Sequence, residues 1–261
     1  MLNVTVKMHN LQELIRKVYL NGLINDAVLM FKDNRMKIEA IGMEDEQGVV
    51  DQTLTIDVNY PCEVTEGGNV AINGIGTLLS NLELFERDDI VQLSISAKNE
   101  LVVVRTTPSQ VLTYDLADIQ FIKTYSTGLK TIFGAPIKIV KLDGKEKLIA
   151  FDTTVVVDGQ KLKEHAKKVS AIKATSVPIR VIGGKLITDI KGEISGLTRE
   201  VEGVTSASGN SGSTFKGDIL TIFNHGIGTA TLRFSEGSPI HVHFEHESMT
   251  ADYLLQVFVE R

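Results

Sequence analysis

The sequence places several lysines on a segment that is predicted to be a helix, and these cations could bind a polyanion. Leu162, Ala166 and Val169 recur at helical spacing and predict a buried stripe. A similar stripe predicts another helix near the N-terminus. The cations that flank the two stripes are Arg16 and Lys17 on the earlier helix, and Lys161, Lys163, Lys167 and Lys168 on the later one. Such cations can contact nucleic-acid phosphates without reading bases, although a solvated helix face is the simpler interpretation.

His241 and His243 alternate along a segment that is predicted to be a strand, so their imidazoles share one face. Two imidazoles on one face could begin a metal site, but a tetrahedral site needs further ligands. The alternative, which the sequence favours, is a solvent-facing strand. We therefore expect no metal and no cofactor.

The sequence lacks the motifs of common catalytic sites. It contains no Gly-x-Ser-x-Gly elbow, no Walker loop and no His-Glu-x-x-His helix. Gly74-Ile75-Gly76 lacks the third glycine and the β-α-β setting of a dinucleotide turn, so it is better interpreted as a helix start. Cys62 has no obvious base beside it, which favours a plain thiol. We expect that the protein is not an enzyme.

Composition gives the broad class of the chain. Its 261 residues suffice for about two domains, and 43% apolar with 23% charged residues is ordinary for a globular protein. The net charge of −6 argues against indiscriminate nucleic-acid binding, while the lysine-rich segment 121–175 allows a local basic surface. No apolar run approaches the length of a membrane span. A single cysteine favours a reducing, intracellular setting.

The order of the predicted elements repeats along the chain. Residues 10–42 predict a helix, a strand, a tight turn and another strand, and residues 162–191 predict the same series. Each half continues with a further helix, a hairpin and a closing strand, within 75–114 in the first half and 219–258 in the second. The pattern predicts an α+β fold of two similar domains, each with two helices packed on antiparallel sheets.

The segment between the two halves carries a hairpin signal. Residues 137–149 alternate around Asp143-Gly144, which is a strong two-residue turn. Further along, the small polar residues 203–213 predict a mobile loop. We divide the chain into domains at 1–118 and 151–261, with a connector at 119–150 that contains the inserted hairpin.

Several short stretches of the sequence resemble the DNA sliding clamp family, of which proliferating cell nuclear antigen (PCNA) is the best-known member. These stretches are Leu23-Ile24-Asn25-Asp26-Ala27, Leu112-Thr113-Tyr114-Asp115-Leu116, Phe133-Gly134-Ala135-Pro136 and Ser238-Pro239-Ile240, with Tyr253-Leu254. Together with the duplication they cover nearly the whole chain. Leu255 and Gln256 stand where the family usually has a small residue and a proline, and the hairpin at 137–149 is an insertion. The resemblance is therefore to a divergent clamp, viral or archaeal in character.

The resemblance implies a ring-forming processivity factor without a reaction of its own. Such a homotrimer would encircle double-stranded DNA, tether a DNA polymerase and other replication proteins, and depend on a clamp loader. It would act inside the cell, away from membranes, wherever DNA is replicated.

The resemblance also implies roles for three sets of residues. The DNA-binding set is Arg16, Lys17, Lys161, Lys163, Lys167, Lys168 and Lys216. The subunit-interface set, on strands expected at 109–116 and 185–191, is Val111, Thr113, Asp115, Lys185, Ile187 and Asp189. The partner-binding set is Ile41, Phe133, Ala135, Pro136, Pro239, Tyr253 and Leu255. The alternative for this last set is that its members simply cap the core.

Other functions remain open from the sequence. Within the same class, the chain could be a checkpoint-type clamp subunit or a monomeric processivity factor. From another class, it could be a small metal-binding protein or enzyme that uses His241 and His243. Solution mass separates a ring of three from a monomer, and metal analysis of the purified protein addresses the last alternative.

Overall fold

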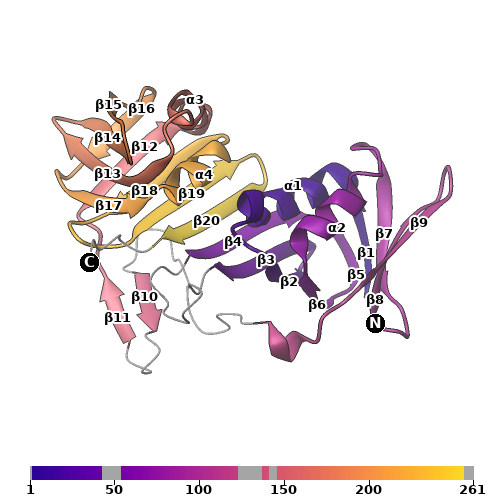
Figure 1. Ribbon diagram of the computed structural model, residues 1–261. Coiled ribbons are helices and arrows are strands. Elements are labelled where there is room, and N and C mark those ends of the chain that lie inside the picture. The colour runs from indigo at the N-terminus through magenta and orange to yellow at the C-terminus, as the bar shows by residue number, and fades with distance from the viewer. Residues whose placement is uncertain (1, 43–53, 123–136, 141–145, 256–261) are drawn as a thin grey trace. The chain divides into compact units, whose positions relative to one another are not determined.

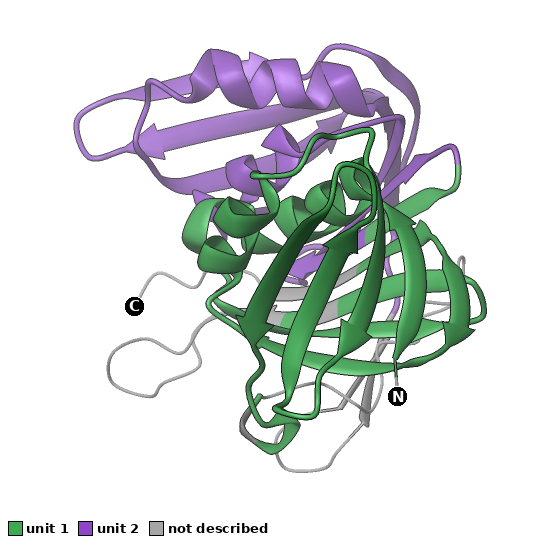
Figure 2. Cartoon of the chain, turned by 90° about the vertical axis from the view of Figure 1, so that its right-hand side faces the viewer, with its two compact units in different colours: residues 1–43, 55–124, 248–251 green, residues 44–54, 125–247, 252–261 purple. Residues whose placement is uncertain are grey.

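The computed structural model describes residues 2–42, 54–122, 137–140 and 146–255 (Figure 1). The chain divides into two compact units (Figure 2). Unit 1 contains residues 1–43, 55–124 and 248–251, and unit 2 contains residues 44–54, 125–247 and 252–261.

Unit 1 contains two α-helices and two antiparallel sheets among its described residues. Its elements are β1 (Asn3–Lys7), α1 (Met8–Tyr19), β2 (Asp26–Lys32), β3 (Arg35–Gly42), β4 (Leu54–Pro61), β5 (Glu63–Glu66), β6 (Gly68–Asn73), α2 (Ile75–Leu82), β7 (Ile90–Ile95), β8 (Glu100–Arg105) and β9 (Gln110–Asp115). One sheet has the strand order β5-β1-β7-β8-β9, and the other strands follow the order β4-β3-β2-β6.

Unit 2 contains the same series of helices and strands. Its elements are β12 (Thr153–Asp158), α3 (Gly159–Val169), β13 (Ala174–Ile182), β14 (Lys185–Gly192), β15 (Gly196–Glu200), β16 (Val204–Ser208), β17 (Gly212–Lys216), α4 (Asp218–Asn224), β18 (Thr229–Phe234), β19 (Ile240–His246) and β20 (Met249–Leu255), of which residues 252–255 belong to unit 2. The strand orders are β16-β12-β18-β19-β20 and β15-β14-β13-β17.

The two units repeat one another element by element. If β1 is matched with β12, α1 with α3 and so on to β9 with β20, the series of helices and strands is identical and the strand orders coincide. The duplication and the α+β class expected from the sequence are therefore confirmed.

The helices form because their apolar residues recur every three or four positions and pack together. In unit 1, α1 and α2 are in contact through buried leucines and isoleucines. Buried apolar residues of the two helices include Leu11, Leu14, Ile15 and Val18 on α1, and Ile75, Leu78, Leu79 and Leu82 on α2. The buried amide of Gln12 donates to the backbone oxygen of Leu82 at 2.9 Å, which satisfies a carbonyl at the end of α2. In unit 2, α3 and α4 make the equivalent contact.

The Gly74-Ile75-Gly76 motif has a structural role. Gly74 adopts a φ of +80° as it precedes α2, a conformation that favours glycine. A Cβ atom on Gly76 would lie 2.9 Å from the ring of Tyr19, so glycine lets α2 approach α1 closely. These two requirements explain both glycines, and the helix start expected from the sequence is confirmed.

Residues 203–213 do not form the mobile loop that we expected. Most of them belong to β16 and the start of β17, which pair with β12 and β13. The expectation was wrong because the backbone groups of β12 and β13 require hydrogen-bond partners, and this requirement outweighs the loop-like composition.

The hairpin expected at 137–149 is present. β10 (Ile137–Val140) pairs antiparallel with β11 (Glu146–Ile149), with Ile137 opposite Ile149 and Val140 opposite Glu146. The turn residues between the strands lie outside the described residues. No helix in the described part of the chain combines the length and the apolar character needed to cross a membrane.

Candidate functional site

The lysines of α3 lie largely on its open side, as the stripe of apolar residues predicted. Lys161, Lys167 and Lys168 are exposed and Lys163 is half-buried, while Leu162 is fully buried. The helix begins at Asp158, whose carboxylate accepts hydrogen bonds from the backbone N–H groups of Gln160 and Lys161, at 2.8 and 3.0 Å. This cap satisfies two of the N–H groups at the start of the helix that have no partner within it.

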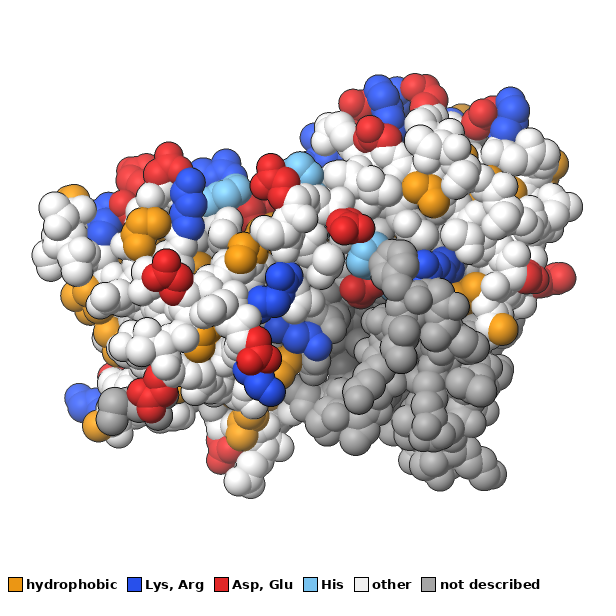
Figure 3. Space-filling model, turned by 180° about the vertical axis from the view of Figure 1, so that it is seen from behind, with side chains coloured by type: hydrophobic (Ala, Val, Ile, Leu, Met, Phe, Trp, Pro, Cys, Tyr) orange, Lys and Arg blue, Asp and Glu red, His pale blue; other side chains and the backbone are white. Residues whose placement is uncertain are grey.

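Two of the exposed lysines already contact carboxylates. Lys161 Nζ lies 2.9 Å from Glu164, and Lys168 Nζ lies 3.8 Å from Glu202. The hydrogen bond that Lys161 donates to the Glu164 carboxylate raises the pKa of Lys161, so this side chain stays a cation. Lys163 and Lys167 make no ion pair within the described part of the chain. On the face shown in Figure 3, blue and red side chains are likewise interspersed rather than gathered into one basic tract.

The two cations of α1 differ from the expectation. Arg16 contacts two carboxylates, Glu13 at 2.5 Å and Glu83 at 2.9 Å. Lys17 is only 3% exposed, so it does not lie on the open side of the helix where we placed it. Lys17 follows Leu14 by three residues, and residues at that spacing share a helix face, so the side chain is drawn to the buried side. Lys216, in β17, is half-buried.

β9 is an edge strand of the five-stranded sheet, as the sequence suggested. It pairs with β8, and Val111, Thr113 and Asp115 are exposed along it. The N–H of Leu116 donates to the oxygen of Asn99, the residue before β8, at 3.2 Å. Because hydrogen-bonding direction alternates along an antiparallel strand, the N–H groups of Val111, Thr113 and Asp115 point away from β8, toward the open edge.

β14 is an interior strand, not the edge strand that we expected at 185–191. Ile187 lies opposite Arg180 of β13 on one side and opposite Glu200 of β15 on the other. The side chain of Asp189 contacts Arg180 at 2.6 Å and accepts a hydrogen bond from Thr198 at 2.5 Å. The backbones of Ile187 and Asp189 are thus already paired. Lys185, at the start of β14, contacts Glu200 at 2.9 Å.

The edge of this sheet beside β14 is β15, which the sequence did not reveal to us; the opposite edge is β17. All of its residues except the half-buried Arg199 are exposed, including the large apolar Leu197. The N–H of Val201 donates to Leu186 at 2.9 Å, so by alternation the N–H groups of Thr198 and Glu200 face the open edge. The sequence signal for this strand is weak, because it is only a five-residue segment of mixed polarity between two glycine-containing turns.

The partner-binding set is only partly described by the structure. Ile41 lies in β3, and Phe133, Ala135 and Pro136 lie outside the described residues. Pro239 is buried. Tyr253 and Leu255 are 0% and 2% exposed, and the Tyr253 ring packs edge-on against Phe244 at 5.9 Å between centroids. The burial of Tyr253 and Leu255 agrees with the alternative that they are core residues.

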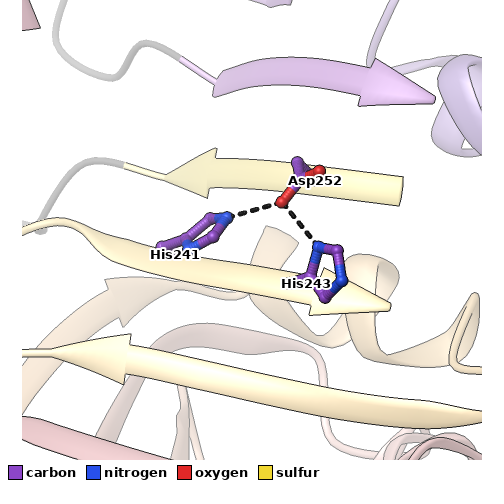
Figure 4. A group of neighbouring side chains, drawn as sticks. All are labelled: His241, His243 and Asp252. Atoms are coloured by element: carbon purple, nitrogen blue, oxygen red, sulfur yellow. Dashed lines mark hydrogen bonds and ion pairs between the residues drawn. The ribbon is translucent and has the colours of Figure 1, made fainter. Parts of the chain in front are cut away.

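β19 and β20 bring together a cluster that the sequence identified only in part (Figure 4). Asp252 Oδ1 lies 2.7 Å from His241 Nε2 and 2.8 Å from His243 Nδ1. Both histidines are buried, at 2% and 5% exposure, so the solvent-facing strand that we favoured is wrong. Burial alone would raise the pKa of Asp252, but the hydrogen bonds and charges of the two histidines outweigh it and lower the pKa to about 2. Asp252 is therefore a carboxylate that accepts from both rings.

His165 on α3 is a second buried histidine of unit 2, with 3% exposure. Its Nε2 lies 2.9 Å from Thr188 Oγ1, and that hydroxyl donates to the oxygen of Arg199 at 3.3 Å, so the imidazole N–H donates to Thr188. The Nδ1 atom is buried and has no hydrogen-bond partner in the described chain. Burial, with nearby Arg199 and Lys168, lowers the pKa of His165 to about 4.

Comparison with known proteins gives matches by structure. No protein-family model matches the chain, and no curated protein matches its sequence. A structure described as the C-terminal region of FEN-1 bound to A. fulgidus PCNA is similar over 100% of both chains, with a TM-score of 0.73 and 16% identity. The PCNA2–PCNA3 complex from Sulfolobus tokodaii has a TM-score of 0.74 at 15% identity, over 99% of this chain and 100% of that one. PCNA from Entamoeba histolytica has a TM-score of 0.72 at 12% identity, over 98% of both chains.

These matches extend over both units and involve the duplicated series of elements described above. At such low identity they show the fold alone. The chain therefore has the α+β DNA-clamp fold, which is the fold that its sequence stretches resembled.

Proposed function

We propose that this chain is one subunit of a ring-shaped DNA sliding clamp, a processivity factor that tethers a DNA polymerase to duplex DNA. The observation that carries the proposal is the duplicated clamp fold together with an open strand edge in each unit, β9 in one and β15 in the other. A closed ring cannot leave DNA without opening, so its hold on DNA is topological and needs no reaction.

Two different open edges favour assembly head to tail. We propose that β9 of one subunit pairs with β15 of the next, which would occupy the outward N–H groups of Thr113 and Thr198. The exposed side chains of Val111 and Leu197, at 59% and 38%, would be covered in the same contact. Such a heterologous interface closes into a ring when the rotation per subunit fits. A homotrimer of 28.6 kDa chains is the ring that we propose.

The α3 lysines support weak contacts with DNA phosphates. Lys163 and Lys167 have no carboxylate partner among the described residues, while Lys161 and Lys168 pair with Glu164 and Glu202. Exposed ion pairs of this kind contribute little to stability, so a phosphate can replace the carboxylate easily. Lys216 and Arg16 would add to the positive electrostatic potential that attracts the DNA phosphates. Contacts of this strength allow sliding, because no single phosphate holds the ring in place.

The lysine assignment predicts opposite effects of two double variants. Lys163→Ala with Lys167→Ala is expected to weaken DNA binding and to reduce the slope of log K against log salt by about 0.9 for each phosphate that the variant no longer binds. Glu164→Gln with Glu202→Gln is expected to strengthen binding, because it frees Lys161 and Lys168. Fluorescence anisotropy with duplex DNA over a salt series measures both.

The matched control for these variants is Lys98→Ala, which removes an exposed lysine in the turn between β7 and β8. It should leave affinity and salt slope unchanged. If the two α3 lysine changes have no larger effect than Lys98→Ala, α3 does not face the DNA.

Partners would be held by short peptides, as one matched PCNA is described with the C-terminal region of FEN-1 bound. We propose a DNA polymerase, other replication proteins and a clamp loader as partners of this chain, inside the cell where DNA is replicated. Ile41, Phe133, Ala135 and Pro136 remain the proposed contact residues. Pro239, Tyr253 and Leu255 would support them from the core, since all three are buried.

Retention on circular DNA tests the proposed function directly. Protein assembled on a nicked plasmid is expected to remain bound through washes at high salt and to leave after a restriction enzyme linearises the plasmid. A monomeric processivity factor would leave both forms equally at high salt. A checkpoint-type subunit would form the ring only with different chains, and this would appear as a single-chain mass for the purified protein.

A further inference from the structure

The strongest feature that the clamp function does not use is the histidine cluster, which we define as His241, His243 and Asp252. The two histidines alternate on β19, and Asp252 lies on β20, its neighbour in the sheet. One ligand atom of each residue lies within 4.8 Å of the other two, and both histidine nitrogens point toward the same Asp252 oxygen (Figure 4). Because paired strands position all three side chains, the arrangement does not depend on a loop.

We propose that the histidine cluster binds one divalent transition-metal ion, and that Zn²⁺ is the ion its ligands suit. Two imidazole nitrogens and one carboxylate oxygen are ligands that Zn²⁺ prefers, and tetrahedral coordination leaves one position for water. The Asp252 side chain is 19% exposed, so solvent can supply that water. The histidine side chains are 2% and 6% exposed, so water competes little for their nitrogens.

The hydrogen bonds of the cluster indicate which hydrogens the ion would displace. The Asp252 carboxylate accepts from His241 Nε2 and His243 Nδ1, so each of those atoms carries a hydrogen in the metal-free chain. An ion that binds the same three atoms takes the place of both hydrogens. For each imidazole to stay neutral, the proton must leave the metal-binding nitrogen and the other ring nitrogen must take up a proton from solvent, so the tautomer of each ring changes when the ion binds. The ligand atoms need to separate slightly, because atoms bound to one Zn²⁺ at about 2.0–2.1 Å lie farther apart than hydrogen-bonded atoms.

Two features of the surroundings limit the expected affinity. His241 Nδ1 is buried without a hydrogen-bond partner in the described chain, whereas a metal-bound histidine normally donates its other N–H. The missing acceptor weakens metal binding by about 10–100-fold. Arg233 lies opposite His241 on β18 and adds a positive charge nearby. We therefore expect saturable binding of one ion per chain that a strong chelator reverses.

Cobalt titration of the full-length chain tests the proposal. After treatment with a chelator and its removal, Co²⁺ is expected to give the visible absorption of a tetrahedral site, saturating at one ion per chain. Zn²⁺ should then displace the Co²⁺ and abolish the absorption. Zn²⁺ should also raise the melting temperature by about 5 °C at a hundredfold excess over its dissociation constant.

Single substitutions identify the ligands. His243→Gln and Asp252→Asn are each expected to abolish saturable Co²⁺ binding. His246→Gln, which removes an exposed histidine from the same strand, is the matched control and should bind like the unsubstituted chain.

X-ray absorption of the unsubstituted chain with Zn²⁺ gives a result that does not depend on the folding of any variant. It should show a shell of nitrogen and oxygen with the scattering of two imidazoles. A sulfur ligand, unsaturable binding, or binding that survives His243→Gln in a folded chain would each overturn the proposal. The cluster would then be a hydrogen-bonded link between β19 and β20 only.

Discussion

Thr113→Pro is expected to convert the proposed ring into single chains, with the mass falling to 28.6 kDa in sedimentation equilibrium. The Thr113 N–H points away from β8, so proline removes a donor that only a neighbouring subunit would use. The bonds from β9 to β8 come from alternate residues, such as Leu112 and Tyr114, and should survive. Thr113→Ala keeps the N–H and is expected to retain the ring.

A proline in the other edge strand, β15, tests whether β9 pairs with β15. Thr198→Pro in β15 should also give single chains, because the Thr198 N–H faces the open edge. Each variant then keeps one intact edge, β15 in the first and β9 in the second. A mixture of the two should therefore form a dimer of twice 28.6 kDa, although neither variant assembles alone. A mixture that stays monomeric, or a Thr113→Pro protein that keeps the ring mass, would refute the pairing of β9 with β15.

Acidification is expected to destabilise the chain through His165, by about 2 kcal/mol between pH 7 and pH 4.5. The pKa of this histidine is about 4 in the folded chain, below its ordinary value of 6.5. The unfolded chain therefore binds the proton more tightly, and stability falls as the pH drops from 6.5 toward 4. The physical reason is that a proton on Nδ1 would be buried without an acceptor.

His165→Gln removes this titration and should retain the hydrogen bond to Thr188. Urea midpoints at a fixed protein concentration are expected to fall less with acid in this variant than in the unsubstituted chain. His246→Gln is the control, because that histidine is exposed. Asp252 does not interfere in this range, since its pKa is lowered from 3.8 to about 2 and its contribution to stability is lost only below pH 3.8. Equal acid sensitivity of His165→Gln and the unsubstituted chain would exclude His165 as the cause.

Local spacing in the sequence determined much of the fold. The apolar stripes of α1 and α3, the helix start at Gly74 and the hairpin of β10 and β11 were all predicted, because each depends on residues a few positions apart. The duplication followed from the order of these local signals. The edge position of β9 was also predicted, although from a family resemblance rather than from spacing.

Only the tertiary structure decided features that depend on residues far apart. β14 is interior because β15 adds to its side, and residues 204–208 are a strand because β12 offers an unpaired backbone. Glu202 approaches Lys168 through packing that helical spacing does not specify. The His241 and His243 pair was visible in the sequence, but Asp252 joined it only when β20 paired beside β19. The register between two strands determines which side chains meet, and that register is a property of the folded sheet.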